Sequence, residues 1–329
     1  MGKLYKNVSI VGAGTWGIAI ANHLAPKSSV EVSHYRNSFL TNLDKNRRHP
    51  QLLGFKIPKK ISFKSDVRFD TDLLVVATPV QYMRKVLSNI AISANTPVLI
   101  LSKGIEQKTL MFPLDIVKDT MSLEDQKIAV LSGPSHAEEV ISKNPTSVVI
   151  SSKSKELAKS LQHLLSDENF RVYCNEDIVG VQLGGAVKNV ISIASGIVVG
   201  LGYGDNTVSA LLTRGIYELK ALGLKLGAKK ETLNGLAGLG DLMATSFSTH
   251  SRNRYVGKKI GEGESLESVL SALNMSAEGV ATAKSLNDLS SSIGVSLPIC
   301  DKVYEILFLD KDPWLSIQEL MLRNLRDEF

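Results

Sequence analysis

Residues 7–17 of the chain read Asn-Val-Ser-Ile-Val-Gly-Ala-Gly-Thr-Trp-Gly, a short apolar run that leads directly into three spaced glycines. The spacing Gly12-x-Gly14-x-x-Gly17 is typical of a strand that turns tightly into a helix and binds the pyrophosphate of a dinucleotide. Gly12 permits the sharp turn, Gly14 lets the backbone approach a ligand, and Gly17 lets the helix pack close to the strand. The N–H groups at the start of a helix beginning at Thr15 would then face the phosphates. The alternative is an ordinary structural turn.

Size and composition indicate a globular protein with room for two domains. The chain has 329 residues, of which 43% are hydrophobic and 22% are charged. The net charge is +5, but the basic residues are spread out, and no basic stretch carries aromatic residues for base stacking. We therefore expect a surface that attracts phosphorylated metabolites, and no nucleic-acid site.

The cysteines and the apolar runs limit the other classes of protein. Cys174 and Cys300 are far apart and lack metal-ligand spacing, so neither a disulfide nor a metal site is expected. Cys174 ends an apolar stretch, which predicts a buried thiol. The amino terminus has no apolar signal region, and the longest near-apolar run, 190–202, is too short and glycine-rich to span a bilayer. These features predict a cytoplasmic protein with no integral membrane segment.

The first half alternates short β-branched runs with helical stretches, which is typical of a parallel sheet wound by helices. Strands are expected at 7–11, 29–34, 73–78, 98–102, 128–131, 147–151 and 171–174, and helices at 15–24, 80–90, 112–120, 137–142 and 155–165. No strand is expected after about residue 176, where a long helix over 176–200 opens a helical second half. The fold class is therefore α/β, a Rossmann-like doubly wound, mainly parallel sheet followed by an all-α C-terminal domain. We place the NAD(P)-binding domain at 1–178 and the substrate-binding, catalytic domain at 179–329.

The loops after the expected strands indicate where the ligands bind. In an open parallel sheet, ligands lie across the carboxyl ends of the strands. The loops at those ends carry small, polar or basic residues, at 12–17, 35–37, 78–81, 102–104 and 132–135.

The end of the second expected strand bears on the choice of cofactor. An NAD-specific fold usually places Asp or Glu there, whereas this chain has His34-Tyr35-Arg36. Arg36 can stack on the adenine and pair with a 2′-phosphate. We therefore expect NADP(H), with NAD(H) also accepted. The alternative is that Arg36 is an ordinary surface arginine.

The second half opens with a lysine inside an otherwise apolar helix, in Gly184-Gly185-Ala186-Val187-Lys188. Lysine is rarely buried without a partner. Each of the two glycines costs about 1 kcal/mol relative to alanine in a helix interior. We expect Gly184 and Gly185 to let a flat ring or substrate approach, and Lys188 to act as an acid/base facing the nicotinamide. The alternative is a Lys188 side chain that extends to the surface.

Further basic and polar residues are expected at the same site. Lys103 follows an apolar strand and therefore lies at a carboxyl end of the sheet. A neighbouring cation lowers the pKa of an ammonium, whereas Asp241, in a second glycine-rich stretch, would oppose that shift. Ser251, Arg252 and Asn253 offer a hydroxyl, a guanidinium and an amide that suit a phosphate monoester. The alternative for these three is an ordinary polar surface loop.

Together these segments resemble the bacterial-type, NAD(P)-dependent glycerol-3-phosphate dehydrogenase family. The resemblance runs in consistent order over nearly the whole chain and is carried by residues 12–17, 102–106, 132–140, 183–189, 235–242, 251–253 and 277–279. It implies the reversible reduction of dihydroxyacetone phosphate to sn-glycerol 3-phosphate, a precursor of phospholipid head groups. It also implies a homodimer.

By this resemblance Lys188 is the proton donor and acceptor of the reaction. The residues implied to contact the dinucleotide are Gly12, Gly14, Thr15, Trp16, Gly17, Arg36, Lys103, Ala137, Arg252, Ser276 and Glu278. Those implied to contact the substrate are Lys103, Gly133, Ser135, Lys188, Asp241, Ser251, Arg252 and Asn253. One region departs from the family, which usually has Tyr-Leu-Pro-Gly where this chain has Gln51-Leu52-Leu53-Gly54. The resemblance therefore supplies no aromatic cofactor contact from residues 49–54, and His49 is not taken as a replacement.

Two other functions remain open. A β-hydroxyacid dehydrogenase acting on a carboxylated substrate would also need a helix lysine after paired glycines. It would differ from a glycerol-3-phosphate dehydrogenase in that its activity would not depend on a phosphate ester. A redox sensor that binds NADP(H) without turnover would keep residues 12–17. It would have no reason to keep Lys188, Lys103 and Arg252 together.

Overall fold

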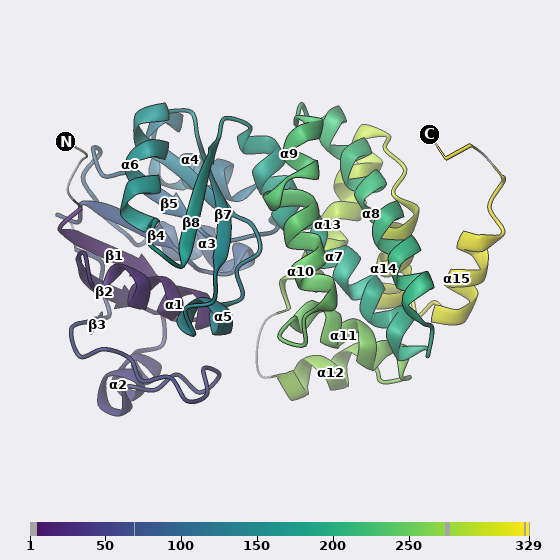
Figure 1. Cartoon of the computed structure of the whole chain (residues 1–329), viewed down its shortest axis with the longest axis horizontal. Coiled ribbons are helices and arrows are strands. Elements are labelled where there is room, and N and C mark those ends of the chain that lie inside the picture. Colours follow the sequence, from purple (N-terminus) through teal and green to yellow (C-terminus); the bar gives the residue numbers. More distant parts are fainter. Residues whose placement is uncertain (1–4, 69, 274–276, 326, 329) are drawn as a thin grey trace.

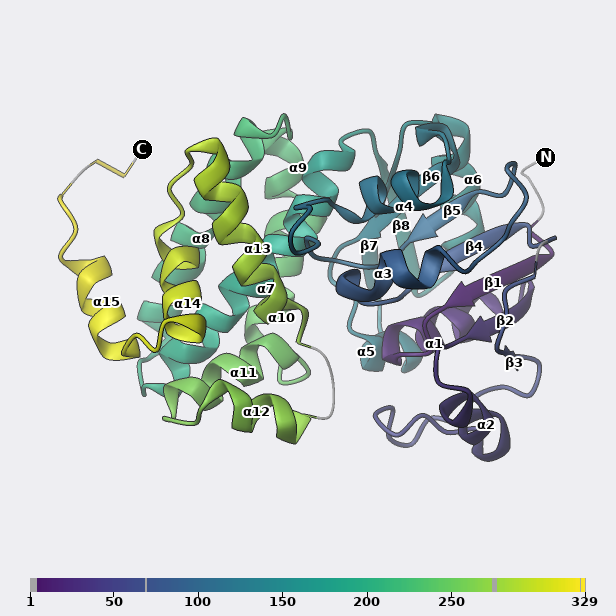
Figure 2. The ribbon, with the colours of Figure 1, turned by 180° about the vertical axis from the view of Figure 1, so that it is seen from behind.

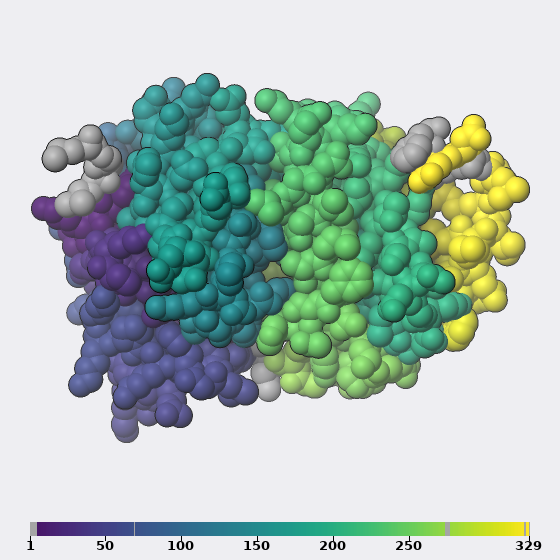
Figure 3. Space-filling view, viewed as in Figure 1, coloured from purple at the N-terminus to yellow at the C-terminus, as the bar shows by residue number. Residues whose placement is uncertain are grey.

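The computed structural model describes residues 5–68, 70–273, 277–325 and 327–328. Figure 1 shows a half that contains a sheet, at the amino-terminal end of the chain, beside a half built of helices alone. In the space-filling view of Figure 3 the surfaces of the two halves meet along their shared boundary. The expected α/β class and the change to an all-helical second half are therefore confirmed.

Within the described residues the sheet has eight strands in the order β3-β2-β1-β4-β5-β6-β7-β8. Neighbouring strands are parallel, except that β7 is antiparallel to β6. The strands are β1 (Asn7–Val11), β2 (Ser29–Ser33), β3 (Ser62–Lys64), β4 (Leu73–Val76), β5 (Val98–Ile100), β6 (Ile128–Ser132), β7 (Thr146–Ser152) and β8 (Phe170–Asn175). The strand order reverses on the two sides of β1, so the crevice that binds ligands in such sheets opens at its carboxyl end.

In the part of the chain that the structure describes, six helices and one short 3₁₀ turn connect these strands. The helices are α1 (Thr15–Leu24), α2 (Asn37–Asn46), α3 (Val80–Leu87), α4 (Pro113–Met121), α5 (Ala137–Ile141) and α6 (Lys155–Leu165), and the turn is η1 (Asp125–Lys127). Successive strand residues point to opposite faces of the sheet. In β4, Val75 joins the core under α1 and α6, whereas Val76 joins the core under α3 and α4. Figures 1 and 2 show these two helix layers from opposite sides. Burial of both faces explains why the strands read as continuous apolar runs.

The turn between β1 and α1 has the geometry expected from its glycines. Gly12 has a φ of +115°, and a Cβ there would lie 2.6 Å from the carbonyl oxygen of Ala77. A Cβ on Gly17 would lie 1.9 Å from the carbonyl oxygen of Gly12. By contrast, a Cβ on Gly14 would have no neighbour within 4 Å. Gly12 and Gly17 are therefore required by the fold, while Gly14 borders open space.

The helical half is organised around α7 (Ile178–Gly200), nearly all of which is buried. The other elements are α8 (Asp205–Lys225), α9 (Lys230–Asn234), the π-helical turn η2 (Leu236–Gly240), α10 (Asp241–Phe247), α11 (Arg252–Gly261), α12 (Leu266–Leu273), α13 (Glu278–Ile293), α14 (Pro298–Phe308) and α15 (Pro313–Met321). Helix α11 touches α7 backbone to backbone, since a Cβ on Gly257 would lie 2.0 Å from the carbonyl oxygen of Ile193. Helix α7 is long and apolar enough to cross a membrane, but 89% of its most apolar window is buried inside the protein. It is a core helix.

Helix α7 belongs to two cores. Its first turn, with Ile178 and Val181, packs into the core under α3 and α4, whereas Leu183 and the apolar residues after it form the core of the helical half. This shared helix fixes the position of Lys188 relative to the sheet.

Four features were not foreseen from the sequence. Strand β3 and helix α2 were not expected. The sheet is mainly parallel, as expected, but the sequence did not indicate that β7 is the strand that runs antiparallel to its neighbour β6. The expected burial of Cys174 is wrong, because Cys174 lies near the end of the edge strand β8 and is exposed, while Cys300 in α14 is buried. An apolar run at a sheet edge is covered on one side only, so its last residues can remain accessible.

Candidate active site

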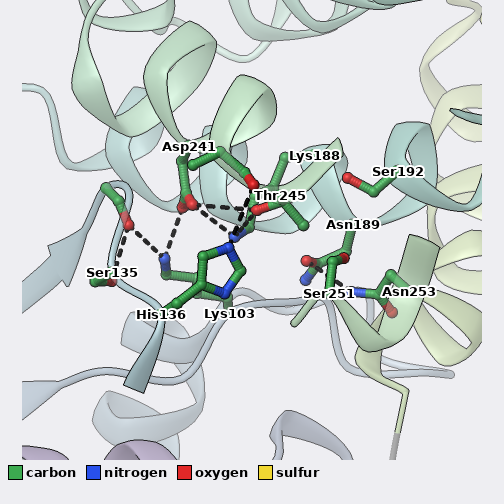
Figure 4. A network of polar contacts seen from close by, with 12 residues as sticks. Lys103, Ser135, His136, Lys188, Asn189, Ser192, Asp241, Thr245, Ser251 and Asn253 are labelled. Carbon is green, nitrogen blue, oxygen red and sulfur yellow. Dashed lines mark hydrogen bonds and ion pairs between the residues drawn. The ribbon is translucent and has the colours of Figure 1, made fainter. Parts of the chain in front are cut away.

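The polar residues expected at the site come together where the carboxyl ends of β5 and β6 face α7 and α10. Figure 4 shows this group. Lys103 follows β5, Gly133 follows β6, and Lys188 and Asp241 lie on the two helices. The chain therefore brings residues more than a hundred positions apart into one network.

Lys188 is buried, with 7% of its surface exposed. Its Nζ donates to Oδ1 of Asp241 at 2.6 Å and to Oγ1 of Thr245 at 2.8 Å. The alternative of a Lys188 side chain extending to the surface is therefore wrong. A lysine in this position needs a buried acceptor, and the carboxylate supplies it.

Asp241 bridges two lysines. Its Oδ2 accepts from Nζ of Lys103 at 2.6 Å, and the same Nζ donates to the carbonyl oxygen of Gly133 at 3.1 Å. The hydroxyl of Ser135 donates to that carbonyl at 2.9 Å. The network carries two ammonium groups against one carboxylate, so it is suited to an anionic ligand.

Burial and neighbouring charges shift the pKa values of this pair. Burial lowers the pKa of Lys188 to about 8, and the Lys103 ammonium adds to the lowering while Asp241 opposes it. Burial alone would raise the pKa of Asp241, but Lys103 and Lys188 together hold it below its usual value. Lys188 can therefore exchange a proton near neutral pH, whereas Asp241 stays ionised.

The paired glycines before Lys188 have a different role from the one expected. A Cβ on Gly184 would lie 2.2 Å from the carbonyl oxygen of Ala237, in η2. A Cβ on Gly185 would lie 2.8 Å from Oγ of Ser132 and 3.2 Å from Cδ of Lys103. The expectation of room for a flat ring is wrong at these positions, because the chain itself fills the space. The glycines let η2 and Lys103 approach α7, and this approach brings Asp241 to Lys188.

Residues 251–253 begin α11 beside this network. Oγ of Ser251 caps the helix by accepting from the N–H of Arg254 at 3.2 Å. Nδ2 of Asn253 donates to Oδ1 of Asn189 at 2.9 Å, and Oδ1 of Asn253 accepts from the N–H of Gly279 at 3.0 Å. Ser251 and Asn253 are buried, so the alternative of an ordinary polar surface loop fails for both.

Arg252 and Glu278 are placed together at the amino-terminal ends of α11 and α13. Burial raises the pKa of Glu278 to about 7, against the opposing effects of a backbone N–H from Val80 and of the Arg252 charge. Oε2 of Glu278 is buried without a hydrogen-bond partner among the described residues. Such an orphaned polar atom indicates a missing ligand or water. Ser276, also expected here, lies outside the described residues.

The remaining residues that were expected to contact a dinucleotide lie along the carboxyl ends of β1, β2 and β6. Thr15 and Trp16 begin α1, and Ala137 begins α5. The Arg36 guanidinium carbon lies 5.1 Å from the centre of the Tyr35 ring, and Tyr35 is 72% exposed. This exposed pair presents a flat cationic surface at the end of β2.

Sequence reasoning missed three polar residues at or near the site. Thr245 accepts from Lys188, and Asn189 accepts from Asn253. His49 is buried and hydrogen-bonds the backbone of Ala13, inside the glycine-rich turn. For Asn189 a signal existed, since it follows Lys188 in an apolar helix. His49 belongs to a loop whose position depends on tertiary structure.

No group of three His, Cys, Asp or Glu side chains in the described parts of the chain could hold a metal ion.

Comparison with known proteins identifies the family. The amino-terminal model of the NAD-dependent glycerol-3-phosphate dehydrogenases matches residues 7–158, and the carboxyl-terminal model matches residues 177–318. Glycerol-3-phosphate dehydrogenase [NAD(P)+] of Halothermothrix orenii is 41% identical over 98% of this chain and 96% of its own length. The Chlorobium phaeobacteroides enzyme of the same name is 41% identical over 98% of both chains.

A solved structure agrees with the sequence comparisons. The crystal structure of glycerol-3-phosphate dehydrogenase from Coxiella burnetii superposes with a TM-score of 0.93 at 32% identity, covering 97% of this chain and all of that one. The resemblance stated from sequence motifs is confirmed over both halves of the fold. The chain belongs to the NAD-dependent glycerol-3-phosphate dehydrogenase family.

Proposed function

We propose that the chain reduces dihydroxyacetone phosphate to sn-glycerol 3-phosphate with NADPH or NADH, and that Lys188 transfers the proton. The observation that carries this proposal is the buried Lys188–Asp241 pair, with 2.6 Å between Nζ and Oδ1, in a member of this dehydrogenase family. A buried ammonium whose pKa lies near 8 can give a proton to an alkoxide and take it back in the reverse reaction.

The turn between β1 and α1 fits a dinucleotide. Helix α1 has no side-chain cap and no acidic residue in its first turn, so its first N–H groups and its positive dipole end suit a pyrophosphate. The open space at Gly14 leaves room for that group. Residues 12–17, Arg36, Lys103, Ala137, Arg252, Ser276 and Glu278 would hold the dinucleotide. The bound nicotinamide supplies the hydride.

The residues around Lys188 orient it and balance its charge. Asp241 fixes the Nζ of Lys188 through Oδ1, and Thr245 accepts a second hydrogen. One hydrogen on Nζ is then left to point at the substrate oxygen, because an ammonium has three donors. Lys103, held by Asp241 and Gly133, adds a second positive charge where negative charge develops on the substrate.

The start of α11 would bind the phosphate of the substrate. Arg252 supplies the parallel N–H groups that match a phosphate. Ser251 uses its oxygen as a helix cap, which leaves the hydroxyl hydrogen to donate. Asn253 donates one of its two amide hydrogens to Asn189, and we assign the other amide hydrogen to the substrate. Gly133 and Ser135 complete the proposed substrate contacts.

The end of β2 favours NADP(H) over NAD(H). The Tyr35–Arg36 pair offers a stacking surface for adenine and a charge for a 2′-phosphate, and His34-Tyr35-Arg36 holds no carboxylate that would repel it.

We also propose roles for the two domains, a cellular location, a pathway and an oligomeric state. We assign cofactor binding to residues 1–178 and substrate binding with catalysis to residues 179–329. The reaction would take place in the cytoplasm, supply glycerophospholipid synthesis and be carried out by a homodimer. Light scattering of the purified protein tests the last point, since a monomer mass would contradict it.

The deciding experiment is a steady-state assay that follows loss of NADPH absorbance after addition of dihydroxyacetone phosphate. Rapid turnover with the phosphate ester and little with unphosphorylated dihydroxyacetone is expected. Equal activity on both compounds would favour a β-hydroxyacid dehydrogenase. Binding of NADPH without any turnover would favour a redox sensor.

A further inference from the structure

Arg36, to which we assign the 2′-phosphate contact, is an exposed residue between β2 and α2. An arginine side chain carries much rotamer freedom, and part of that freedom is lost when the guanidinium binds a phosphate. An Arg36 that is already restricted loses less entropy on binding and therefore binds the phosphate more tightly. Contacts that restrict Arg36 before the cofactor arrives thus bear directly on cofactor choice.

Hydrogen bonds fix the backbone of Arg36 on both sides. Its N–H donates to Nδ1 of His34 at 3.1 Å. Its carbonyl oxygen accepts from the N–H groups of Phe39 and Leu40, at 3.1 and 3.2 Å, in the first turn of α2. Helix α2 has no side-chain cap at Arg36, so His34 supplies the side-chain hydrogen bond at the start of this helix.

The half-buried ring of His34 packs against two aromatic rings. The ring centres of His34 and Tyr35 are 4.5 Å apart, and those of His34 and Phe39 are 5.1 Å apart. Such distances are typical of stabilising aromatic pairs. Tyr35 in turn lies under the Arg36 guanidinium, 5.1 Å from its carbon to the ring centre. His34 therefore contacts both members of the pair that we assign to the adenine and the 2′-phosphate.

The turn that carries Arg36 starts from a fixed point. The carbonyl oxygen of Ser33, at the end of β2, accepts from the N–H of Gly12 at 2.9 Å. The end of β2 is thus joined to the glycine-rich turn that we assign to the pyrophosphate. His34 is the next residue, so a change at His34 should affect Arg36 without moving the glycine-rich turn.

The geometry points to His34 as a positioning residue that sets cofactor choice by holding Arg36 where it meets the 2′-phosphate of NADP(H). This inference rests on the 2′-phosphate contact proposed for Arg36. His34 acts through Arg36 and need not touch the cofactor.

The hydrogen bond defines what His34 contributes to the turn. A backbone N–H only donates, so Nδ1 of His34 is unprotonated and the neutral ring carries its hydrogen on Nε2. The contribution of His34 is therefore that of an acceptor. An asparagine can provide the same acceptor, because its side-chain oxygen bonds the backbone two residues further along the chain. A phenylalanine would keep a ring but provide no acceptor.

The test uses two variants that separate the acceptor from the ring. His34→Phe keeps the aromatic packing and removes the acceptor, whereas His34→Asn keeps an acceptor and removes the ring. His163→Phe is the matched control, since His163 is an exposed histidine on α6. KM and kcat are measured for NADPH and for NADH at saturating dihydroxyacetone phosphate, together with the melting temperature of each protein.

His34→Phe is expected to raise the KM for NADPH about two- to tenfold, which corresponds to the loss of one hydrogen bond. Its KM for NADH and its kcat with either cofactor should change little. His34→Asn should keep the KM for NADPH near wild type and lose melting temperature instead, while His163→Phe matches wild type throughout.

Three outcomes would overturn the inference. The first is an unchanged KM for NADPH in His34→Phe, and the second is a parallel rise of its KM for NADH. The third is an equal rise of the KM for NADPH in His34→Asn, because the ring and not the acceptor would then be what matters.

Arg36→Ala in the same series keeps this inference separate from the proposed function. An unchanged preference for NADPH in Arg36→Ala would remove the proposed 2′-phosphate contact, and the role of His34 with it. A lost preference in Arg36→Ala beside a normal His34→Phe would remove the role of His34 alone. The double variant should have the same KM for NADPH as Arg36→Ala, since His34 acts through Arg36, and additive losses would overturn the inference.

Discussion

Lys188 and Asp241 are 53 positions apart in the chain, yet Nζ of Lys188 lies 2.6 Å from Oδ1 of Asp241, and both side chains are buried. One residue lies on α7 and the other begins α10, and the glycine-rich turn η2 lets the two helices come this close.

Replacing Lys188 by alanine removes the proposed proton donor. We expect kcat for reduction to fall by about 10²–10⁴-fold, the usual contribution of a general acid. The dissociation constant for NADPH, measured by fluorescence titration, should change little. Lys225→Ala, at the exposed end of α8, is the control and should keep full activity. Turnover close to wild type in Lys188→Ala would exclude this residue as the acid.

The pH dependence of turnover should report the Lys188 pKa. Reduction needs the ammonium, so kcat/KM for dihydroxyacetone phosphate should fall as the pH rises through about 8, while oxidation should rise over the same range. Asp241→Asn removes the charge that raises the pKa of Lys188 and leaves the Lys103 charge that lowers it. The inflection should therefore move to lower pH in this variant. An unmoved or higher inflection would argue against direct coupling of the pair.

Asp241 should also contribute to stability. Removing one partner of a buried ion pair costs about 3–5 kcal/mol, because the other charge is left uncompensated. We expect Asp241→Asn to lower the free energy of unfolding, measured with urea, by that order. The loss should be larger below the pKa of Lys188 than above it, because Lys188 can become neutral only when the pH is above its pKa. Asp288→Asn, exposed on α13, should show no such loss, and equal losses at both pH values would contradict the explanation.

Substitutions of two glycines in the β1–α1 turn should have different effects, one on cofactor binding and the other on stability. Gly14→Ala adds a Cβ in open space, so the melting temperature should hold while the KM for NADPH rises, because the Cβ would meet the bound pyrophosphate. Gly17→Ala places a Cβ 1.9 Å from the carbonyl oxygen of Gly12, and overpacking of this kind costs about 1–3 kcal/mol or more. Its melting temperature should therefore fall. A Gly14→Ala protein with unchanged KM would exclude close approach of the cofactor at this residue.

Arg36 should decide the preference between the two cofactors. Hydrogen bonds to charged groups are worth about 1.5–3 kcal/mol, so Arg36→Ala should raise the KM for NADPH about tenfold or more. The KM for NADH should change much less, since NADH has no 2′-phosphate. Arg171→Ala is a matched control, because Arg171 also stacks on a tyrosine, with 5.1 Å between the guanidinium carbon and the Tyr173 ring centre. Parallel losses for both cofactors would rule out a 2′-phosphate contact.

Much of the fold was predictable because local signals were strong. The bounds of β1, α1 and α6 agree with those expected from the sequence. Strand β3 has three residues, and α2 reads Asn-Ser-Phe-Leu-Thr-Asn-Leu-Asp-Lys-Asn, where weak helix formers hide the pattern. The antiparallel direction of β7 is set by where the chain returns to the sheet, which periodicity does not encode.

The candidate site was predictable in its residue types and less so in its contacts. A lysine in an apolar helix indicated a buried partner, and Asp241 is that partner. The role of Gly184 and Gly185 was not predictable, since it depends on η2 for Gly184 and on Ser132 and Lys103 for Gly185, all of which are distant in sequence. The same holds for Thr245 and His49, whose positions are set by the packing of separate elements.

The sharing of α7 between two cores limits how this enzyme can be taken apart. A fragment ending before Ile178 would leave the sheet with an uncovered apolar patch, and a fragment beginning there would expose Ile178 and Val181 to water. Joining a different helical half to this sheet would therefore fail unless its first helical turn packed against the same core under α3 and α4. The sheet-containing half and the helical half of this architecture are consequently not interchangeable modules, and a change in the helical half would have to arise within that half itself.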